Sequence, residues 1–169
     1  MLNPQLDRRG ELIHLLTTEG LPRRHVERLL DAAAGFAQED AAVANASTAT
    51  PATTSGTLAA SSAAPLDLPL YLGVPADDAE LRRAYASAGQ RLGLRPIPLG
   101  DDLPAGNIPA PAAGLPPGIL VLRHAASGAA VSAAAAAPSG LRILNAGDGI
   151  HADPCLLYTS DAADERSSV

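Results

Sequence analysis

Short apolar runs alternate with longer helix-like segments between residues 66 and 149, and this alternation constrains the fold more than any other feature. The runs are Leu68–Val74, Leu94–Leu99, Ile119–Leu122 and Leu141–Leu144. Short continuous apolar runs are typical of buried strands. Strands that alternate with helices along a chain indicate a parallel sheet. The sequence therefore predicts an α/β fold, with a parallel sheet flanked by helices.

Two helices are expected between these strands. The first spans about Ala76–Leu92 and follows Pro75, and the second spans Ala125–Ala137 and is closed by Pro138. In parallel sheets, ligands bind at the carboxyl ends of the strands. The polar residues expected at such ends are Arg123, His124, Asn145 and Asp148. We expect a ligand site, if the chain has one, to lie among them.

Residues 11–37 are predicted to be helical. Glu11–Leu16 is a short apolar segment that stops at Gly20, and a second helix opens at Leu21–Pro22, where the missing proline N–H costs little. Apolar residues recur at helical spacing in this second helix, which predicts one buried stripe. The stripe consists of Val26, Leu29, Leu30, Ala33 and Phe36. His14 and His25 are expected to be satisfied or solvent-facing helix histidines rather than ligands.

Composition divides the rest of the chain. Residues 38–65 are rich in Ala, Ser and Thr and bury too little to offset their ordering entropy, so we expect a flexible linker or insertion there. It would join N-terminal helices at 1–37 to an α/β domain at 66–154. Aromatic residues make up only 2% of the chain, so the core is expected to be built from Ala, Leu and Val and to be marginally stable.

The charge pattern excludes several classes of function. Twelve basic residues stand against 18 acidic ones, a net charge of −6, which argues against a nucleic-acid partner. Every basic residue is arginine, so chemistry that requires a lysine amine is excluded.

Met1–Gly10 is polar where a signal peptide would be apolar, and Ala129–Ala137 is too short to span a bilayer. We therefore expect a cytoplasmic chain with no membrane partner.

The end of the chain stands apart from the rest. Cys155–Glu165 resembles one reading frame of a transposon-end adapter used in sequencing libraries, so residues 155–169 are expected not to be native. The only cysteine, Cys155, belongs to this segment, and a single cysteine excludes a disulfide framework. We expect no cofactor and no metal site.

Three segments, in order along the chain, carry a resemblance to a known family. The first is residues 1–34, where Gly10–Leu16 and Glu19–Pro22 carry the likeness. The second is Val121–Ala129. The third is Asn145–Pro154, which reads Asn-Ala-Gly-Asp-Gly-Ile-His-Ala-Asp-Pro. All three resemble the catalytic chain of bacterial aspartate carbamoyltransferases. The family transfers the carbamoyl group of carbamoyl phosphate to aspartate in pyrimidine synthesis.

The resemblance implies a two-domain α/β fold and a trimer with sites shared between subunits. This chain would be the first, carbamoyl-phosphate-binding domain, and the second domain, which binds aspartate, would be missing. Partners would then be carbamoyltransferase chains in a homo- or hetero-trimer. Such a site must hold a phosphate dianion and polarise a carbonyl, which requires arginines, hydroxyls, N–H groups and a histidine donor.

Only part of the family's site has a counterpart here. Arg123 stands at the substrate-binding arginine, and Arg82 is the one residue of the phosphate cradle that the alignment retains. The cradle itself falls on residues 78–82, where hydroxyls are replaced by acids. Asp77 and Asp78 suit a helix N-terminus as caps. They would also face the incoming phosphate, and a like charge at ~4 Å costs about 4 kcal/mol at an effective dielectric of 20.

Two further family positions are altered. Gly100–Pro104 replaces the loop that carries serine and lysine to a neighbouring subunit, and Asp153 replaces the histidine that donates to the carbonyl. An ionised aspartate cannot donate a hydrogen bond. His151 lies two residues away, where the family also has histidine, and is not expected to substitute. We expect carbamoyl phosphate binding to be weak or lost and no catalytic residue to be retained.

Alternative hypotheses follow from these departures. In the first, the chain is part of an active enzyme and the alignment of its middle region is wrong. In the second, it is a non-catalytic structural or regulatory subunit that assembles with an active carbamoyltransferase or another enzyme of the pathway. In the third, it is the product of a decaying gene. A hydrolase triad of Ser127, His124 and Asp148 lacks a nucleophile elbow. Metal binding by His124 and His151 with Asp148 or Asp153 matches no standard spacing.

Overall fold

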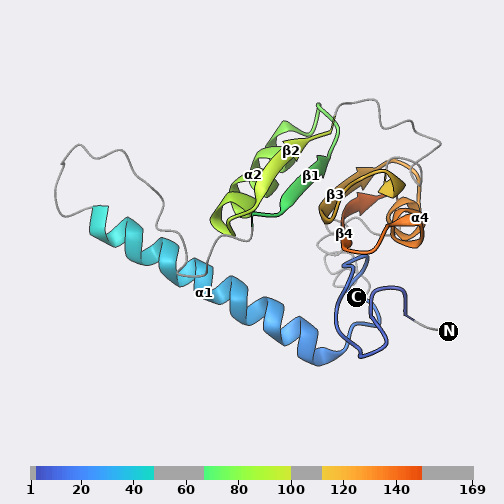
Figure 1. Ribbon diagram of the computed structural model, residues 1–169. Helices are drawn as coiled ribbons and strands as arrows, with labels where there is room; N and C mark the ends of the chain where they lie inside the picture. Colours follow the sequence, from blue (N-terminus) through green and yellow to red (C-terminus); the bar gives the residue numbers. More distant parts are fainter. Residues whose placement is uncertain (1–2, 48–66, 100–111, 150–169) are drawn as a thin grey trace, which may run out of the picture. The chain divides into compact units, whose positions relative to one another are not determined.

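The structure is a computed structural model that describes residues 3–47, 67–99 and 112–149 (Figure 1). The chain divides into two compact units. One unit comprises Met1–Thr17 and Ala60–Val169 and contains the sheet. The other comprises Thr18–Ala59 and contains one long helix. Within the described residues, no helix is both long enough and apolar enough to cross a membrane.

The described part of the first unit contains a sheet of four parallel strands, which confirms the predicted α/β class. The strands are β1 (Pro69–Gly73), β2 (Arg95–Pro98), β3 (Gly118–His124) and β4 (Leu141–Asp148). Their order is β2-β1-β3-β4, with Tyr71 of β1 opposite both Ile97 and Leu120. The chain moves from β1 to one side and then crosses to the other, so the topological switch point lies between β1 and β3.

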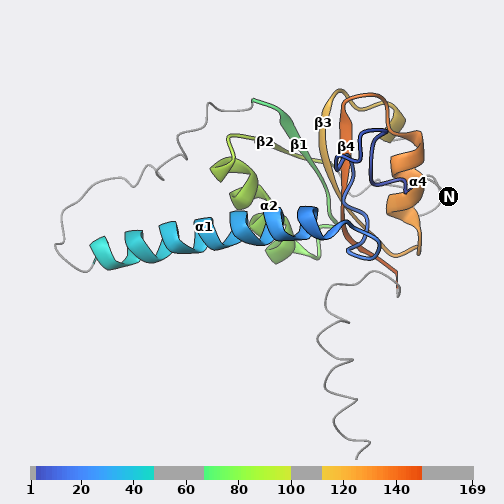
Figure 2. The same ribbon diagram turned by 90° about the horizontal axis from the view of Figure 1, so that it is seen from below.

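One helix packs on each face of this sheet (Figure 2). Helix α2 (Ala79–Arg91) places Leu81 and Tyr85 against the apolar cluster around Leu72 and Val121. Helix α4 (Ala129–Ala136) buries three alanines against the opposite cluster, which includes Leu120 and Ile143. Because alanine is small, α4 can approach the strands closely. The core is built mainly from Leu, Ala and Val, as the composition predicts.

Both helices begin later than predicted, each for a local reason. The chain first makes a turn after β1, closed by the Asp78 N–H, which donates to the Pro75 carbonyl at 3.1 Å. Helix α2 therefore starts at Ala79 rather than Ala76. Gly128 adopts a left-handed conformation with φ 77°, which a helix cannot continue through, so α4 starts at Ala129.

The predicted helix at Glu11–Leu16 is wrong, because this segment is extended and lies along the edge of β4. Leu15 forms a parallel bridge with Leu144, with its N–H donating to the Ile143 carbonyl at 2.9 Å. The Gln5 side chain is buried and accepts hydrogen bonds from the backbone N–H groups of Leu16 and Thr17. A free strand edge offers unpaired backbone groups, and the N-terminal segment satisfies some of them.

His14 is held by the same contact rather than by a helix. Its ring is buried, and Nδ1 accepts a hydrogen bond from the Ile143 N–H at 3.0 Å. Burial lowers the pKa of His14 below its ordinary value of 6.5, and the Arg142 guanidinium lowers it further. The neutral ring is therefore part of the packing between the N-terminal segment and β4.

The second unit contains α1 (Arg23–Ser47), which begins after Leu21–Pro22 as predicted but continues ten residues past the expected end at 37. Residues 38–47 are thus helical rather than linker, because alanine-rich sequence favours helix. The predicted buried stripe is also wrong, since Leu29 is 45% exposed and Leu30 is 63% exposed. His25 is a buried, partnered helix histidine, as expected.

Candidate functional site

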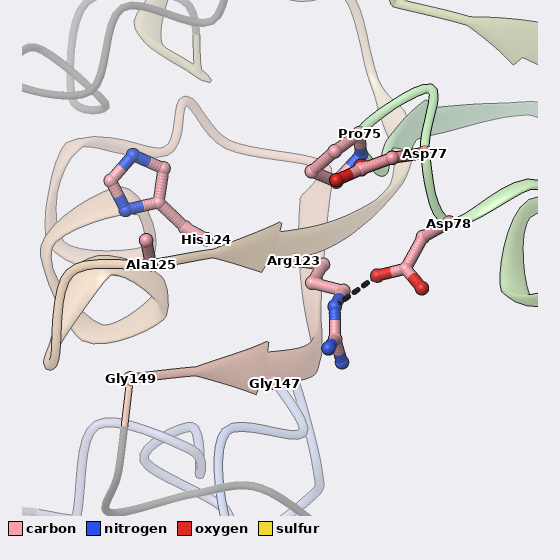
Figure 3. A pocket seen from close by; sticks show the side chains of 8 residues that line it. All are labelled: Pro75, Asp77, Asp78, Arg123, His124, Ala125, Gly147 and Gly149. Carbon is pink, nitrogen blue, oxygen red and sulfur yellow. Dashed lines mark ion pairs between the residues drawn. The ribbon is translucent and has the colours of Figure 1, made fainter.

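A pocket of about 260 Å³ opens at the carboxyl ends of the strands, beside the switch point between β1 and β3 (Figure 3). Three loops and strand ends supply its lining. The lining residues are Pro75, Asp77, Asp78, Arg123, His124, Ala125, Gly147 and Gly149. The prediction that Arg123 and His124 lie at the carboxyl end of a strand is confirmed, since they are the last two residues of β3.

Arg123 occupies the centre of the pocket. Its Nε forms an ion pair with Oδ2 of Asp78, drawn as the dashed line in Figure 3, and its Nη1 lies 3.5 Å from the Ala146 carbonyl oxygen. Both side chains of the ion pair remain about one-third exposed, at 35% for Arg123 and 38% for Asp78. Solvent therefore screens the pair, and a pair of this kind contributes about 0–1 kcal/mol to stability.

A bulge in β4 makes room for the guanidinium. Leu122 pairs with Asn145 but Arg123 pairs with Gly147, so Ala146 is an extra residue in β4. Gly147 has φ 129°, and a Cβ at this position would lie 3.0 Å from Nη1 of Arg123. Glycine is therefore favoured by the backbone conformation, and a side chain here would also displace the end of Arg123.

The two acids of the first strand–helix junction reach the pocket from the turn before α2. Asp78 is at the N-cap position of α2, but its side chain makes no capping hydrogen bond. The expectation that it acts as a side-chain cap is therefore wrong, because its carboxylate pairs with Arg123 instead. Asp77 is exposed and lines the same pocket. Among the described residues, the lining thus has two carboxylates for one guanidinium.

The His124 side chain lines the pocket, with its ring turned away from the Arg123 guanidinium (Figure 3). Its Nδ1 accepts a hydrogen bond from the Ala126 N–H at 2.9 Å, so the proton of the neutral ring is on Nε2. Nδ1 is therefore not available to donate to a carboxylate, as a hydrolase triad would require. Asp148 is buried and engaged elsewhere, and Ser127 does not line the pocket. The triad hypothesis has no geometric support.

Half-buried Asn145 and buried Asp148 form a hydrogen-bond network at the end of β4. The Asn145 Nδ2 donates to the Leu16 carbonyl at 2.9 Å and to Oδ1 of Asp148 at 3.2 Å, while its Oδ1 accepts from the Gly147 N–H at 2.9 Å. Oδ2 of Asp148 lies 3.4 Å from the Ala130 N–H in the first turn of α4. These two side chains tie the N-terminal segment, β4 and α4 together and do not face the pocket.

Arg82 is not among the lining residues. Its Nη2 donates to the Val74 carbonyl at 2.6 Å, which fixes the end of β1 just before the turn that carries the two acids. Arg82 and Arg123 were both predicted to bind substrate, but only Arg123 lines the pocket. Asp153, His151 and the Gly100–Pro104 loop lie outside the described residues.

Tyr85 of α2 was not predicted from the sequence to lie near this site. Burial raises the pKa of its hydroxyl, and the positive charge of Arg123 opposes that rise. The signal was present in the spacing, because Tyr85 lies four residues after Leu81 and so shares its buried helix face.

Comparison with known proteins supports the same architecture. No family model matches the sequence. Among solved structures, the catalytic subunit of M. Jannaschii aspartate transcarbamoylase is similar, with a TM-score of 0.51 and 22% sequence identity. The fold is carbamoyltransferase-like. The match covers 92% of this chain but only 48% of the solved chain, so the present chain spans about half the length of that subunit. At this identity, the likeness establishes the fold.

Proposed function

We propose that the chain corresponds to the carbamoyl-phosphate half of an aspartate carbamoyltransferase-like chain and that it is catalytically inactive. In the proposed ancestor, the pocket beside β1 and β3 holds carbamoyl phosphate while its carbamoyl group passes to the amine of aspartate. The observation that carries the proposal is the ion pair between Asp78 and Arg123, which is the one guanidinium among the described lining residues.

Electrostatics oppose a dianion in this pocket. A phosphate group that reaches Arg123 also approaches Asp78 and Asp77, and each like-charge pair at ~4 Å costs about 4 kcal/mol at an effective dielectric of 20. Partial exposure of these side chains reduces that figure through screening. A single guanidinium whose Nε is already paired does not compensate for two carboxylates.

The donors that the reaction needs are also reduced. The Arg82 guanidinium binds the Val74 carbonyl and does not line the pocket. Asp153 at the family's histidine position would be an acceptor when ionised. Loss of one oxyanion donor typically lowers a rate by ~10²–10³. These losses together support the absence of carbamoyl transfer.

A charge-removal series tests this proposal. Calorimetric titration of carbamoyl phosphate into the wild-type chain is expected to show no saturable binding, whereas Asp78→Asn frees the Arg123 Nε and should raise affinity by about tenfold to a hundredfold. Glu80→Gln removes an exposed acid of α2 that does not line the pocket and serves as the matched control. Binding by the wild type that Asp78→Asn leaves unchanged would overturn the proposal.

A second candidate function is a non-catalytic structural or regulatory subunit. It is supported by Leu29 and Leu30 of α1, two adjacent large apolar side chains that are exposed and offer a surface that a partner would cover. The partner would be a carbamoyltransferase chain or another enzyme of pyrimidine synthesis, in a homo- or hetero-trimer. Light scattering after gel filtration tests this role. An assembly lost in Leu30→Glu supports it, and a monomer in the presence of an active chain refutes it.

A further inference from the structure

In the pocket at the carboxyl ends of the strands, hydrogen-bond acceptors and donors come from different elements of the fold. Asp77 and Asp78 come from the turn before α2, whereas Arg123 and His124 come from the end of β3 (Figure 3). Asp77 forms no ion pair with another described residue, so its carboxylate is available as an acceptor. The Arg123 Nη2 is available as a donor, because Asp78 pairs with Nε and the Ala146 carbonyl accepts from Nη1.

This set of groups selects a ligand by charge. Two carboxylates and one guanidinium give the described part of the lining a net negative charge, which disfavours a dianion. A simple cation would leave the Arg123 Nη2 donor without an acceptor. A ligand with one positive and one negative group satisfies both kinds of protein group at once.

The size of the pocket limits the ligand further. A volume of about 260 Å³ is below the range of about 300–1,000 Å³ that holds drug-sized molecules. Pro75, Ala125 and the two glycines of the lining add no further charge. The ligand must therefore be compact and must carry its two charged groups close together.

We propose that this pocket binds a compact zwitterion of the α-amino-acid class. The ammonium group is held by Asp77 and Asp78, and the carboxylate accepts hydrogen bonds from Nη2 of Arg123. The proposal rests on the proposed function, because it requires that the acids have converted a dianion site into one that prefers a ligand without net charge.

Ligand-observed NMR titration of the full chain tests this inference, with glycine, methylammonium and acetate as probes. Glycine is expected to bind saturably and more tightly than either probe that carries one charged group alone. Asp77→Asn should weaken glycine binding by about tenfold or more, because it removes a charge-assisted hydrogen bond. Glu80→Gln should leave glycine binding unchanged, since Glu80 does not line the pocket.

The outcomes separate the two proposals. Absence of saturable glycine binding to the wild-type chain, or equal affinity for glycine and acetate, overturns the zwitterion site. Equal weakening by Asp77→Asn and Glu80→Gln also overturns it, because the effect would then arise from net charge. Tight binding of carbamoyl phosphate to the wild type overturns the proposed function. Failure of glycine alone leaves the proposed function standing.

Discussion

Asn145→Ala should destabilise the first unit more than any exposed substitution. The amide of Asn145 donates to the Leu16 carbonyl and to Asp148 and accepts from the Gly147 N–H. Each such hydrogen bond contributes about 0.5–1.5 kcal/mol net, and the bond to a carboxylate somewhat more. The variant also leaves the buried Asp148 with one partner fewer. The expected loss is therefore about 3 kcal/mol in the free energy of unfolding.

Urea denaturation followed by circular dichroism measures this loss, and thermal melting should show a fall of roughly 10 °C for a chain of this size. Ser139→Ala, at an exposed position after α4, is the matched control and should change the free energy by less than about 0.5 kcal/mol. A loss of less than about 1 kcal/mol for Asn145→Ala would refute the conclusion that this side chain fastens the N-terminal segment to β4.

Three further predictions concern backbone and protonation. The pKa of His14 is lower in the folded chain than in the unfolded chain, so on acidification the unfolded chain is protonated first. The free energy of unfolding should therefore fall as the pH drops below about 6.5. In urea denaturation curves collected at several pH values, His14→Gln should remove the part of this pH dependence that His14 causes. Gly147→Ala should lower the free energy of unfolding by about 1–3 kcal/mol in urea denaturation, because φ is 129° and the new Cβ would press on Arg123. An unchanged midpoint of urea denaturation would contradict the bulge geometry. Gly35→Ala, where a Cβ meets nothing within 4 Å inside α1, should instead increase helicity in circular dichroism and stabilise the helix by about 0.5–1 kcal/mol.

The sheet could be predicted from the sequence because its central strands are buried on both faces. Such strands read as continuous apolar runs, and β1 and β3 do so clearly. The segment Glu11–Leu16 could not be assigned in the same way, because six apolar-rich residues fit a helix or a strand equally well. Its conformation is decided by backbone hydrogen bonds to Ile143 and Asn145, far along the chain.

The candidate site was predictable in position but not in its contacts. The sequence placed Arg123 and His124 at a strand end and placed Asp77 and Asp78 at the first strand–helix junction, where the structure has them. The ion pair between Asp78 and Arg123 depends on the proximity of two loops and on the Ala146 bulge, neither of which has a local sequence signature. Arg82 was predicted to bind substrate, yet its Nη2 donates to the Val74 carbonyl and the residue does not line the pocket.

Titration of carbamoyl phosphate into the wild-type chain, compared with Arg123→Ala, tests the central claim most directly. If the acids of the pocket repel a doubly charged ligand, calorimetry will record only heats of dilution for both proteins. Saturable binding by the wild type in the micromolar range, abolished in Arg123→Ala, would contradict the account.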